Sequence, residues 1–250
     1  MPDLPQFGPW TLDATRPPAP VIGLIIRGLL GPVPAPPDYL HDVLLAPEGR
    51  AAFFALVDHE GLVVCLDVRT EHPSYRGVRG RSSRGKLSQG EVYHHDGCSG
   101  PVKPRVVEIR FPHQPAARRV ATAVAPFPET AVAMLRLLPE PLASQPEFRV
   151  WNARIAADEA LDRDEWDTLQ ARVTRAIRRH LDPEATRAWF RAVDRAVGAY
   201  DAPWEWGESR FIANRNDQHT FQHRRAYLGP ASDGTANGNL CKRWPAEELG

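Results

Sequence analysis

The chain has 250 residues, of which 42% are hydrophobic and 25% are charged, a balance typical of a globular protein with one large domain or two small ones. Lys and Arg together number 31, as do Asp and Glu, so the formal net charge is zero and the charge indicates no nucleic-acid partner. The three cysteines, Cys65, Cys98 and Cys241, lie far apart, which argues against a disulfide framework and favours a reducing cytoplasm.

The first thirty residues do not predict a targeting segment or a membrane span. Asp3 and several prolines stand where a signal peptide would carry a basic region. The apolar stretch Val21–Leu30 is short and is interrupted by Arg27, so it cannot cross a bilayer. We expect it to form a buried strand.

The first half of the chain predicts both helices and strands. Helices are expected at Asp38–Leu45 and from Pro47 to about His59, where apolar residues recur at helical spacing. Further predicted elements are strands at Leu62–Val68, Arg105–Phe111 and Arg118–Ala125 and a helix at Glu129–Leu138.

Residues 70–89 alternate basic side chains with glycine and serine. The simpler interpretation is a solvated loop, and the functional interpretation is a lid that captures a carboxylate or a phosphate. The basic residues are Arg76, Arg79, Arg81, Arg84 and Lys86.

The second half predicts a strand at Phe148–Ile155 and then two strong helices. The first helix begins at Asp162 with Glu165 three residues later, as in a capping box, and the second begins at Asp182 followed by Pro183. Aromatic residues on these helices fall on their apolar stripes and are assigned to the core. The chain then returns to strands at Trp204–Ala213 and Asn239–Trp244.

Strands before and after a late helical insert predict a mainly β fold with buttressing helices. The arrangement that suits this order is a double-stranded β-helix, the jelly roll of cupin-like proteins. We expect one domain over residues 1–250, with the helical insert at about residues 162–200. In such a fold, strands that are distant in sequence can place metal ligands together at one open end of the jelly roll.

The stretch Gly90–Gly100 carries the first candidate site. Side chains two residues apart on a strand share a face, so His94 and Asp96 can converge while His95 turns away. Two imidazoles and one carboxylate on one face are the ligand set of Fe(II) with open positions. A His-x-Asp pair before a turn also occurs without a metal, so it needs a matching third ligand.

The sequence Asn214-Arg-Asn-Asp-Gln-His219 supplies that candidate. With it, the chain resembles the taurine dioxygenase and clavaminate synthase superfamily of Fe(II)/2-oxoglutarate oxygenases. Members carry an early His-x-Asp/Glu motif and a late Asn-Arg-x-x-x-His motif after a Trp-rich strand. The resemblance covers roughly residues 88 to 244. It implies that His94, Asp96 and His219 bind Fe(II).

The resemblance also implies a site for 2-oxoglutarate. Thr122 lies 28 residues after His94 (122 − 94), where the family has a Thr that contacts this cofactor. The far carboxylate needs a planar bidentate donor, which Arg supplies. Arg243 is the candidate, although its distance of 24 residues from His219 (243 − 219) is longer than usual. Arg225 is the fallback.

His223 is a rival for the distal ligand position. The pattern His223-x-Arg225 resembles the His-Gly-Arg form of some relatives. The spacing from Asn214 fits His219 and not His223. His223 is therefore expected to face another direction or to touch substrate.

The implied activity uses O2 to oxidise a small molecule while 2-oxoglutarate is converted to succinate and CO2. Asp96 argues against a halogenase, in which that carboxylate is missing. Hydroxylation is the default outcome, and desaturation or ring closure stay open. The basic residues between Arg76 and Arg119 favour an anionic, amino-acid-like substrate, and the high Arg, Ala and Pro content suggests specialised metabolism.

Two other functions stay open at this point. A zinc hydrolase could use the same three ligands with a bound water. A jelly-roll binding protein with a vestigial site would bind no metal and form no succinate.

Overall fold

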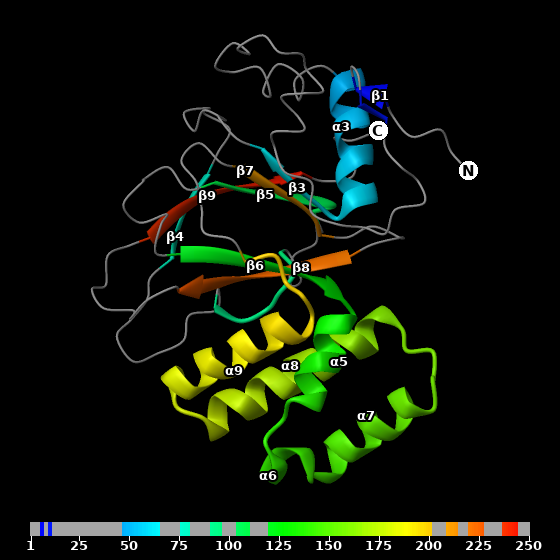
Figure 1. Cartoon of the computed structure of the whole chain (residues 1–250), viewed down its shortest axis with the longest axis vertical. Helices are drawn as coiled ribbons and strands as arrows, with labels where there is room; N and C mark the ends of the chain where they lie inside the picture. The colour runs from blue at the N-terminus through cyan, green and yellow to red at the C-terminus, as the bar shows by residue number, and fades with distance from the viewer. Residues whose placement is uncertain are drawn as a thin grey trace.

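In the computed structural model of the chain, antiparallel sheets are stacked between helix α3 and a layer of further helices (Figure 1). The structure describes residues 6–7, 10–11, 47–65, 76–80, 91–96, 104–110, 120–201, 209–214, 220–227 and 237–244. The strands are β1 (Gln6–Phe7), β2 (Trp10–Thr11), β3 (Leu62–Cys65), β4 (Arg76–Gly80), β5 (Val106–Arg110), β6 (Val120–Phe127), β7 (Ser209–Ala213), β8 (Thr220–Tyr227) and β9 (Asn237–Trp244). The helices are α3 (Pro47–Glu60), α5 (Glu129–Arg136), α6 (Glu140–Ala143), α7 (Pro146–Ala156), α8 (Arg163–His180) and α9 (Pro183–Ala196). The predicted strand Val21–Leu30 and helix Asp38–Leu45 lie outside the described residues.

Two sheets face each other across an apolar interior. The larger has five antiparallel strands in the order β3-β7-β5-β9-β4, and the smaller pairs β6 with β8. Figure 1 shows β6 and β8 between the larger sheet and helices α5, α8 and α9. This layering agrees with the predicted combination of β-sheets and buttressing helices, although the described elements contain more helix than the predicted mainly β fold implies. The buried cluster between the sheets contains Leu62, Val64, Val107, Ile109, Val124, Ile212 and Phe221.

The β6–β8 pair is buried on both faces, so its residues alternate between two environments. Val124 belongs to the cluster between the sheets, whereas Ala123 belongs to the core under the helices. The register pairs Val124 with His223, and directly opposed residues share a face. His223 therefore lies on the face toward the larger sheet, and Gln222 and Arg224 lie on the helical face.

Helix α8 covers that helical face because its apolar residues recur every three or four positions. Leu169, Val173 and Ile177 are fully buried, and burying each of them contributes about 1.5–3 kcal/mol. The predicted capping box is confirmed. The Asp162 side chain accepts from the Glu165 N–H, and the Glu165 side chain accepts from the Asp162 N–H.

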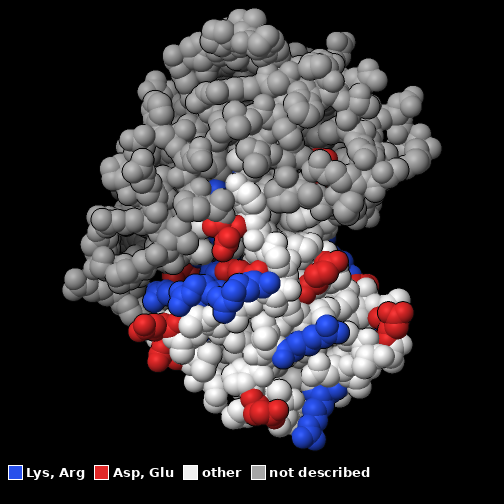
Figure 2. Space-filling model, in the orientation of Figure 1, with Lys and Arg blue, Asp and Glu red and all other residues white. Residues whose placement is uncertain are grey.

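The predicted start of α9 is also confirmed, since Asp182 accepts from the Ala185 N–H and Pro183 occupies the first turn. The helical layer as a whole is longer than predicted. It runs from Glu129 to Ala196, whereas the sequence places the insert at about residues 162–200. Over this half of the molecule, basic and acidic side chains lie side by side on the face that Figure 2 shows. Within the described part of the chain, none of the helices has the length and apolar character that crossing a membrane requires.

The predicted strand at Phe148–Ile155 is wrong, because the segment lies within α7. Pro146 occupies the first turn of this helix, where proline is favoured. Phe148, Trp151 and Ile155 are three and four residues apart and pack against the helical core. Their spacing is therefore that of a helix, although the shorter run also alternates as a strand would.

Four strands, β1, β2, β4 and β8, lie where the sequence predicts none. Strand β8 has buried polar residues on both faces, including Gln222 and His223, so it lacks the apolar alternation by which strands are recognised. Strand β4 lies inside the predicted basic loop and pairs with β9. The remainder of that loop, residues 70–75 and 81–89, falls outside the described residues. Apart from these strands, β3, β5, β6, β7 and β9 lie at the predicted places.

Candidate metal centre

The centre is built where residue 94 meets strand β8. His94 and His223 form an isolated antiparallel bridge, and each backbone N–H donates to the other residue's carbonyl oxygen at 3.2 Å. Because opposed residues of an antiparallel pair share a face, the two imidazoles lie together, with ring centroids 4.5 Å apart. Two segments 129 residues apart (223 − 94) thus place two imidazoles side by side as candidate nitrogen ligands.

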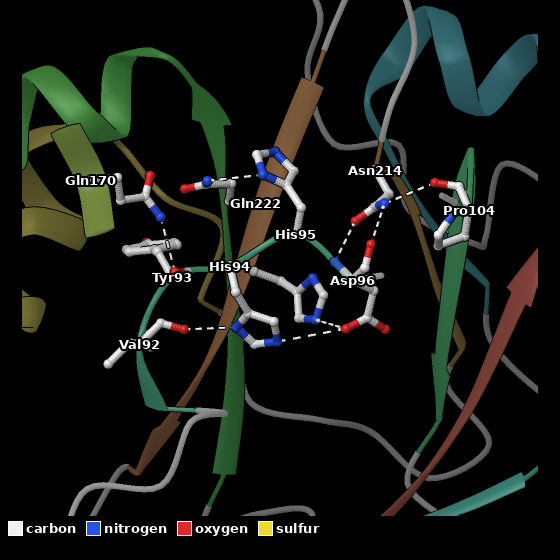
Figure 3. A network of polar contacts seen from close by, with 10 residues as sticks. Val92, Tyr93, His94, His95, Asp96, Pro104, Gln170, Asn214 and Gln222 are labelled. Atoms are coloured by element: carbon white, nitrogen blue, oxygen red, sulfur yellow. Dashed lines mark hydrogen bonds and ion pairs between the residues drawn. The ribbon is translucent and has the colours of Figure 1, made fainter. Parts of the chain in front are cut away.

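Asp96 completes the group two residues after His94, as the period of a strand predicts. Its Oδ1 lies 3.7 Å from His94 Nε2 and 4.0 Å from His223 Nε2, and Figure 3 shows His94 and Asp96 pointing toward each other. One ligand atom from each of the three residues lies within 4.8 Å of the others. The distances of 3.7 and 4.0 Å between the carboxylate oxygen and the two imidazole nitrogens are too long for hydrogen bonds. They fit two donors on one ion, which lie up to about 4.2 Å apart when each bond is about 2.1 Å.

The tautomer of His94 suits metal binding. Its Nδ1 lies 2.8 Å from the carbonyl oxygen of Val92, and a carbonyl only accepts, so Nδ1 carries the proton. The lone pair of the neutral ring is then on Nε2, the nitrogen that faces Asp96. A hydrogen bond from the second ring nitrogen to a backbone carbonyl also fixes the ring plane.

Asn214 holds the backbone of Asp96. Its Oδ1 accepts from the Asp96 N–H at 2.9 Å, and its Nδ2 donates to the Asp96 carbonyl at 3.2 Å and to the Pro104 carbonyl at 2.8 Å (Figure 3). Asn214 is wholly buried. Asn214, the motif residue that serves as a spacing marker in the sequence, therefore holds the backbone of the candidate carboxylate ligand Asp96.

His95 turns away from the centre, as the alternation predicts. It is buried on the helical side, where its Nδ1 lies 3.1 Å from Gln222 Nε2 (Figure 3). The same nitrogen lies 3.7 Å from Asp167 Oδ1. Gln170 of α8 donates to the carbonyl of Tyr93 at 2.9 Å. The segment that carries the first two ligands is therefore anchored to helix α8.

The sequence motif and the structure indicate different residues for the second histidine. His219 lies outside the described residues, whereas His223, the rival in the sequence, is the histidine that meets His94 and Asp96. The strand that presents His223 is the one the sequence does not reveal. A polar strand that is buried on both faces gives no periodic signal.

Two of the candidate 2-oxoglutarate residues lie on the strand pair that carries His223. Thr122 and Arg225 are Cα partners on β6 and β8, two positions from the pair Val124 and His223. Arg243 lies on β9 opposite Val107, a residue of the cluster between the sheets. The side chain of Arg243 is not among those that the structure describes.

Arg210 is a buried residue of this region that the sequence does not single out. It is fully buried on β7, its Nη1 donates to the carbonyl of Thr122 at 2.9 Å, and its guanidinium lies 4.8 Å from the ring centre of Tyr200. The contact ties the larger sheet to β6 at Thr122. An arginine in an otherwise apolar strand, SRFIA, is the signal that marks it.

A cavity of about 780 Å³ lies on the helical side of residues 92–95, and His94 is among the residues that line it. One wall is the segment from Val92 to His95 together with Gln222, and the other is helix α8. Acidic and basic side chains of α8 both reach it. They are Asp164, Asp167, Arg175, Arg178 and Arg179.

Solved structures match this chain over most of its length. The non-haem iron oxygenase OrfP, in complex with Fe, succinate and (3S)-hydroxy-L-Arg, is 14% identical with a TM-score of 0.36, covering 90% of each chain. A taurine dioxygenase from Burkholderia xenovorans is 13% identical with a TM-score of 0.39, covering 78% of this chain and 80% of its own. PvcB from Pseudomonas aeruginosa, an Fe, alpha-ketoglutarate dependent oxygenase from an isonitrile synthetic pathway, is 13% identical with a TM-score of 0.43, covering 82% of each chain.

These neighbours are oxygenases of the kind that the sequence motifs resemble. No family model matches the sequence, and no curated protein matches it.

Proposed function

We propose that this chain is an Fe(II)/2-oxoglutarate-dependent oxygenase with His94, Asp96 and His223 as its iron ligands. One observation carries the proposal: two imidazoles and one carboxylate from distant segments converge with their ligand atoms within 4.8 Å. This donor set is that of non-haem Fe(II) oxygenases, and it leaves open positions on the ion. When bound, Fe(II) supplies those positions to 2-oxoglutarate and O2.

His223 replaces His219 in this assignment for two reasons. It is the residue directly opposite His94, and it shortens the interval to Arg243 to 20 residues (243 − 223), which removes the long gap noted in the sequence. We also infer that the two facing sheets belong to a double-stranded β-helix, with residues 1–250 forming one domain.

The protein's own groups prepare the site in three ways. The Val92 carbonyl keeps the His94 proton on Nδ1 and leaves Nε2 free to coordinate. Asn214 holds Asp96 through both of its backbone polar groups. The rings of His94 and His223 are held side by side by their shared backbone bridge.

The 2-oxoglutarate site is assigned to Thr122 and Arg243, with Arg225 as the alternative anchor. Thr122 and Arg225 lie two positions along the strands from His223, about 6.6 Å away, a span that a five-carbon diacid can bridge. The Arg binds the far carboxylate through a bidentate contact. Both ends of the diacid then have a partner on the inner face.

The cavity beside His94 favours a small polar substrate of amino-acid type. The guanidinium groups of Arg175, Arg178 and Arg179 suit a carboxylate, and the carboxylates of Asp164 and Asp167 suit an ammonium group. Hydroxylation is the default reaction, with desaturation or ring closure as variants, and specialised metabolism is the proposed setting.

Anaerobic addition of Fe(II) and 2-oxoglutarate to the metal-free protein tests the proposal. We expect both to bind with a weak visible metal-to-ligand band, and we expect O2 then to release succinate. A protein that binds Zn(II) and hydrolyses its substrate without O2 would instead be the zinc hydrolase. A protein that binds neither metal nor 2-oxoglutarate would be a binding protein with a vestigial site.

A further inference from the structure

The segment that carries His94 and Asp96 is held by helices through every second residue. Glu91, Tyr93 and His95 are at most 3% exposed, and each contacts α8 or α9. The contacts are Arg187 with Glu91, Asp194 and Gln170 with Tyr93, and Asp167 with His95. His94 lies between Tyr93 and His95, Asp96 follows His95, and the side chains of His94 and Asp96 point toward each other.

One helical residue contacts both ligand segments. The hydroxyl of Tyr93, the residue before His94, donates to Asp194 Oδ1 at 2.7 Å. Arg224, the residue after His223, donates from Nε to the same oxygen at 2.9 Å and from Nη2 to Oδ2. A single carboxylate of α9 therefore binds one neighbour of each histidine ligand.

The Tyr93–Asp194–Arg224 cluster is closed to water and balanced in charge. The three residues are 3%, 4% and 2% exposed. Burial, followed by the charge of Asp194, raises the pKa of Tyr93 well above its usual value, so the phenol keeps its proton and donates. Burial acts to lower the pKa of Arg224, but its bonds to Asp194 raise it overall. The arginine therefore remains a cation.

The backbone alone holds the two ligand segments weakly. Residues 91–96 meet β8 at one isolated bridge, whose two hydrogen bonds are 3.2 Å long, at the upper end of the usual range. A ladder of several bridges would fix the spacing of the strands without side chains. A single bridge leaves that task to contacts on the opposite face.

We propose that Asp194 is a positioning residue of the metal centre, which holds the backbones of His94 and His223 in register by binding Tyr93 and Arg224. This inference rests on the proposed function. Asp194 touches none of the three ligands. It acts through their neighbours, as residues that orient metal ligands from outside the coordination sphere do.

The test needs variants that remove the contact without burying an unpaired charge. Asp194→Asn would leave Arg224 as an uncompensated buried cation, which is strongly destabilising. The double variant D194L/R224M replaces the ion pair with apolar side chains of similar size, a change that proteins often tolerate. Tyr93→Phe removes only the hydroxyl. Thr186→Val is the matched control, because it removes a buried hydroxyl bond of α9 to the Asp182 carbonyl, away from the ligands.

The measurements are the anaerobic dissociation constant for Fe(II) and the melting temperature of the metal-free protein. We expect D194L/R224M to weaken Fe(II) binding about tenfold or more and Tyr93→Phe to weaken it about threefold, with melting temperatures no lower than that of Thr186→Val. Thr186→Val should bind Fe(II) as the wild type does. If the double variant does not fold, the Fe(II) dissociation constants of Tyr93→Phe and Thr186→Val are compared instead, and they test the proposal by themselves.

Two outcomes would overturn the proposal, and they distinguish a failure of the positioning role from a failure of the proposed function. If the wild type binds Fe(II) and both D194L/R224M and Tyr93→Phe bind it equally well, Asp194 supports the fold and not the centre. If the wild type itself binds no Fe(II), the proposed function fails and the positioning role fails with it.

Discussion

The backbones of His94 and His223 lie directly opposite each other and exchange two hydrogen bonds of 3.2 Å. This pairing fixes which residue of β8 can share an ion with His94, because only opposed or diagonal residues on one face of a strand pair come close. Thr220, the residue that follows His219 in the sequence, pairs with Phe127. It lies about 10 Å along the strand from His223. The proposal of His223 as the distal ligand therefore follows from strand register.

Removing the Asn214 side chain should loosen the carboxylate ligand. Asn214→Ala breaks three hydrogen bonds, two of them to the backbone of Asp96. We expect Fe(II) affinity to fall about tenfold to a hundredfold, as measured by anaerobic titration of the metal-free protein.

Ser209→Ala is the control for Asn214→Ala. It removes a buried hydrogen bond to Glu108 Oε1, 2.7 Å long, outside the metal centre, at a cost to stability of about 1 kcal/mol. Its Fe(II) affinity should be that of the wild type. If both variants lose stability and neither loses iron affinity, Asn214 does not position Asp96.

Arg243→Gln should raise the 2-oxoglutarate requirement and leave iron binding nearly intact. Loss of a bidentate, charge-assisted contact costs about 1.5–3 kcal/mol, or about tenfold to a hundredfold in affinity. The measurement is the dissociation constant for 2-oxoglutarate in the presence of Fe(II). The opposite pattern, with Arg225→Gln impaired and Arg243→Gln silent, would assign the anchor to β8.

Disrupting the capping box should lower stability without touching the centre. Asp162→Ala removes the side chain that accepts from the Glu165 N–H at 2.9 Å, a loss of about 1 kcal/mol in the free energy of unfolding. Denaturant unfolding measures the change, and the Fe(II) affinity should be unaltered. A loss of iron affinity in this variant would show that the start of α8 controls the centre.

The cavity predicts where substrate binds. Once a screen of free amino acids for succinate release has found a substrate, Arg175→Ala should raise the KM for that substrate and leave the KM for 2-oxoglutarate unchanged, because Arg175 lines the cavity on helix α8. A change confined to 2-oxoglutarate would place the cofactor in this cavity.

Much of the fold could be predicted because its signals are local. The caps at Asp162 and Asp182 and the apolar periods of α8 and α9 act within one helix, and they are confirmed. The pair His94 and Asp96 was also predicted to share a face from strand geometry, and the structure brings the two together.

What could not be predicted depends on contacts between distant segments. Strand β8 buries Gln222 and Arg224 against partners from residues 91–95 and α9, so its sequence has no apolar alternation. Spacing in the sequence therefore favours His219 over its rival His223. Asp194 stands on the buried face of α9 next to Val193. A carboxylate on the apolar stripe of a helix indicates a buried partner, but the sequence around Asp194 does not identify that partner.

The most direct test of the iron centre compares two histidine variants. Fe(II) and 2-oxoglutarate are added without O2 to wild type, His223→Ala and His219→Ala, and the visible metal-to-ligand band is titrated. With His94, Asp96 and His223 as ligands, the band should be lost in His223→Ala and retained in His219→Ala. Loss of the band in His219→Ala, with His223→Ala unaffected, would contradict the account.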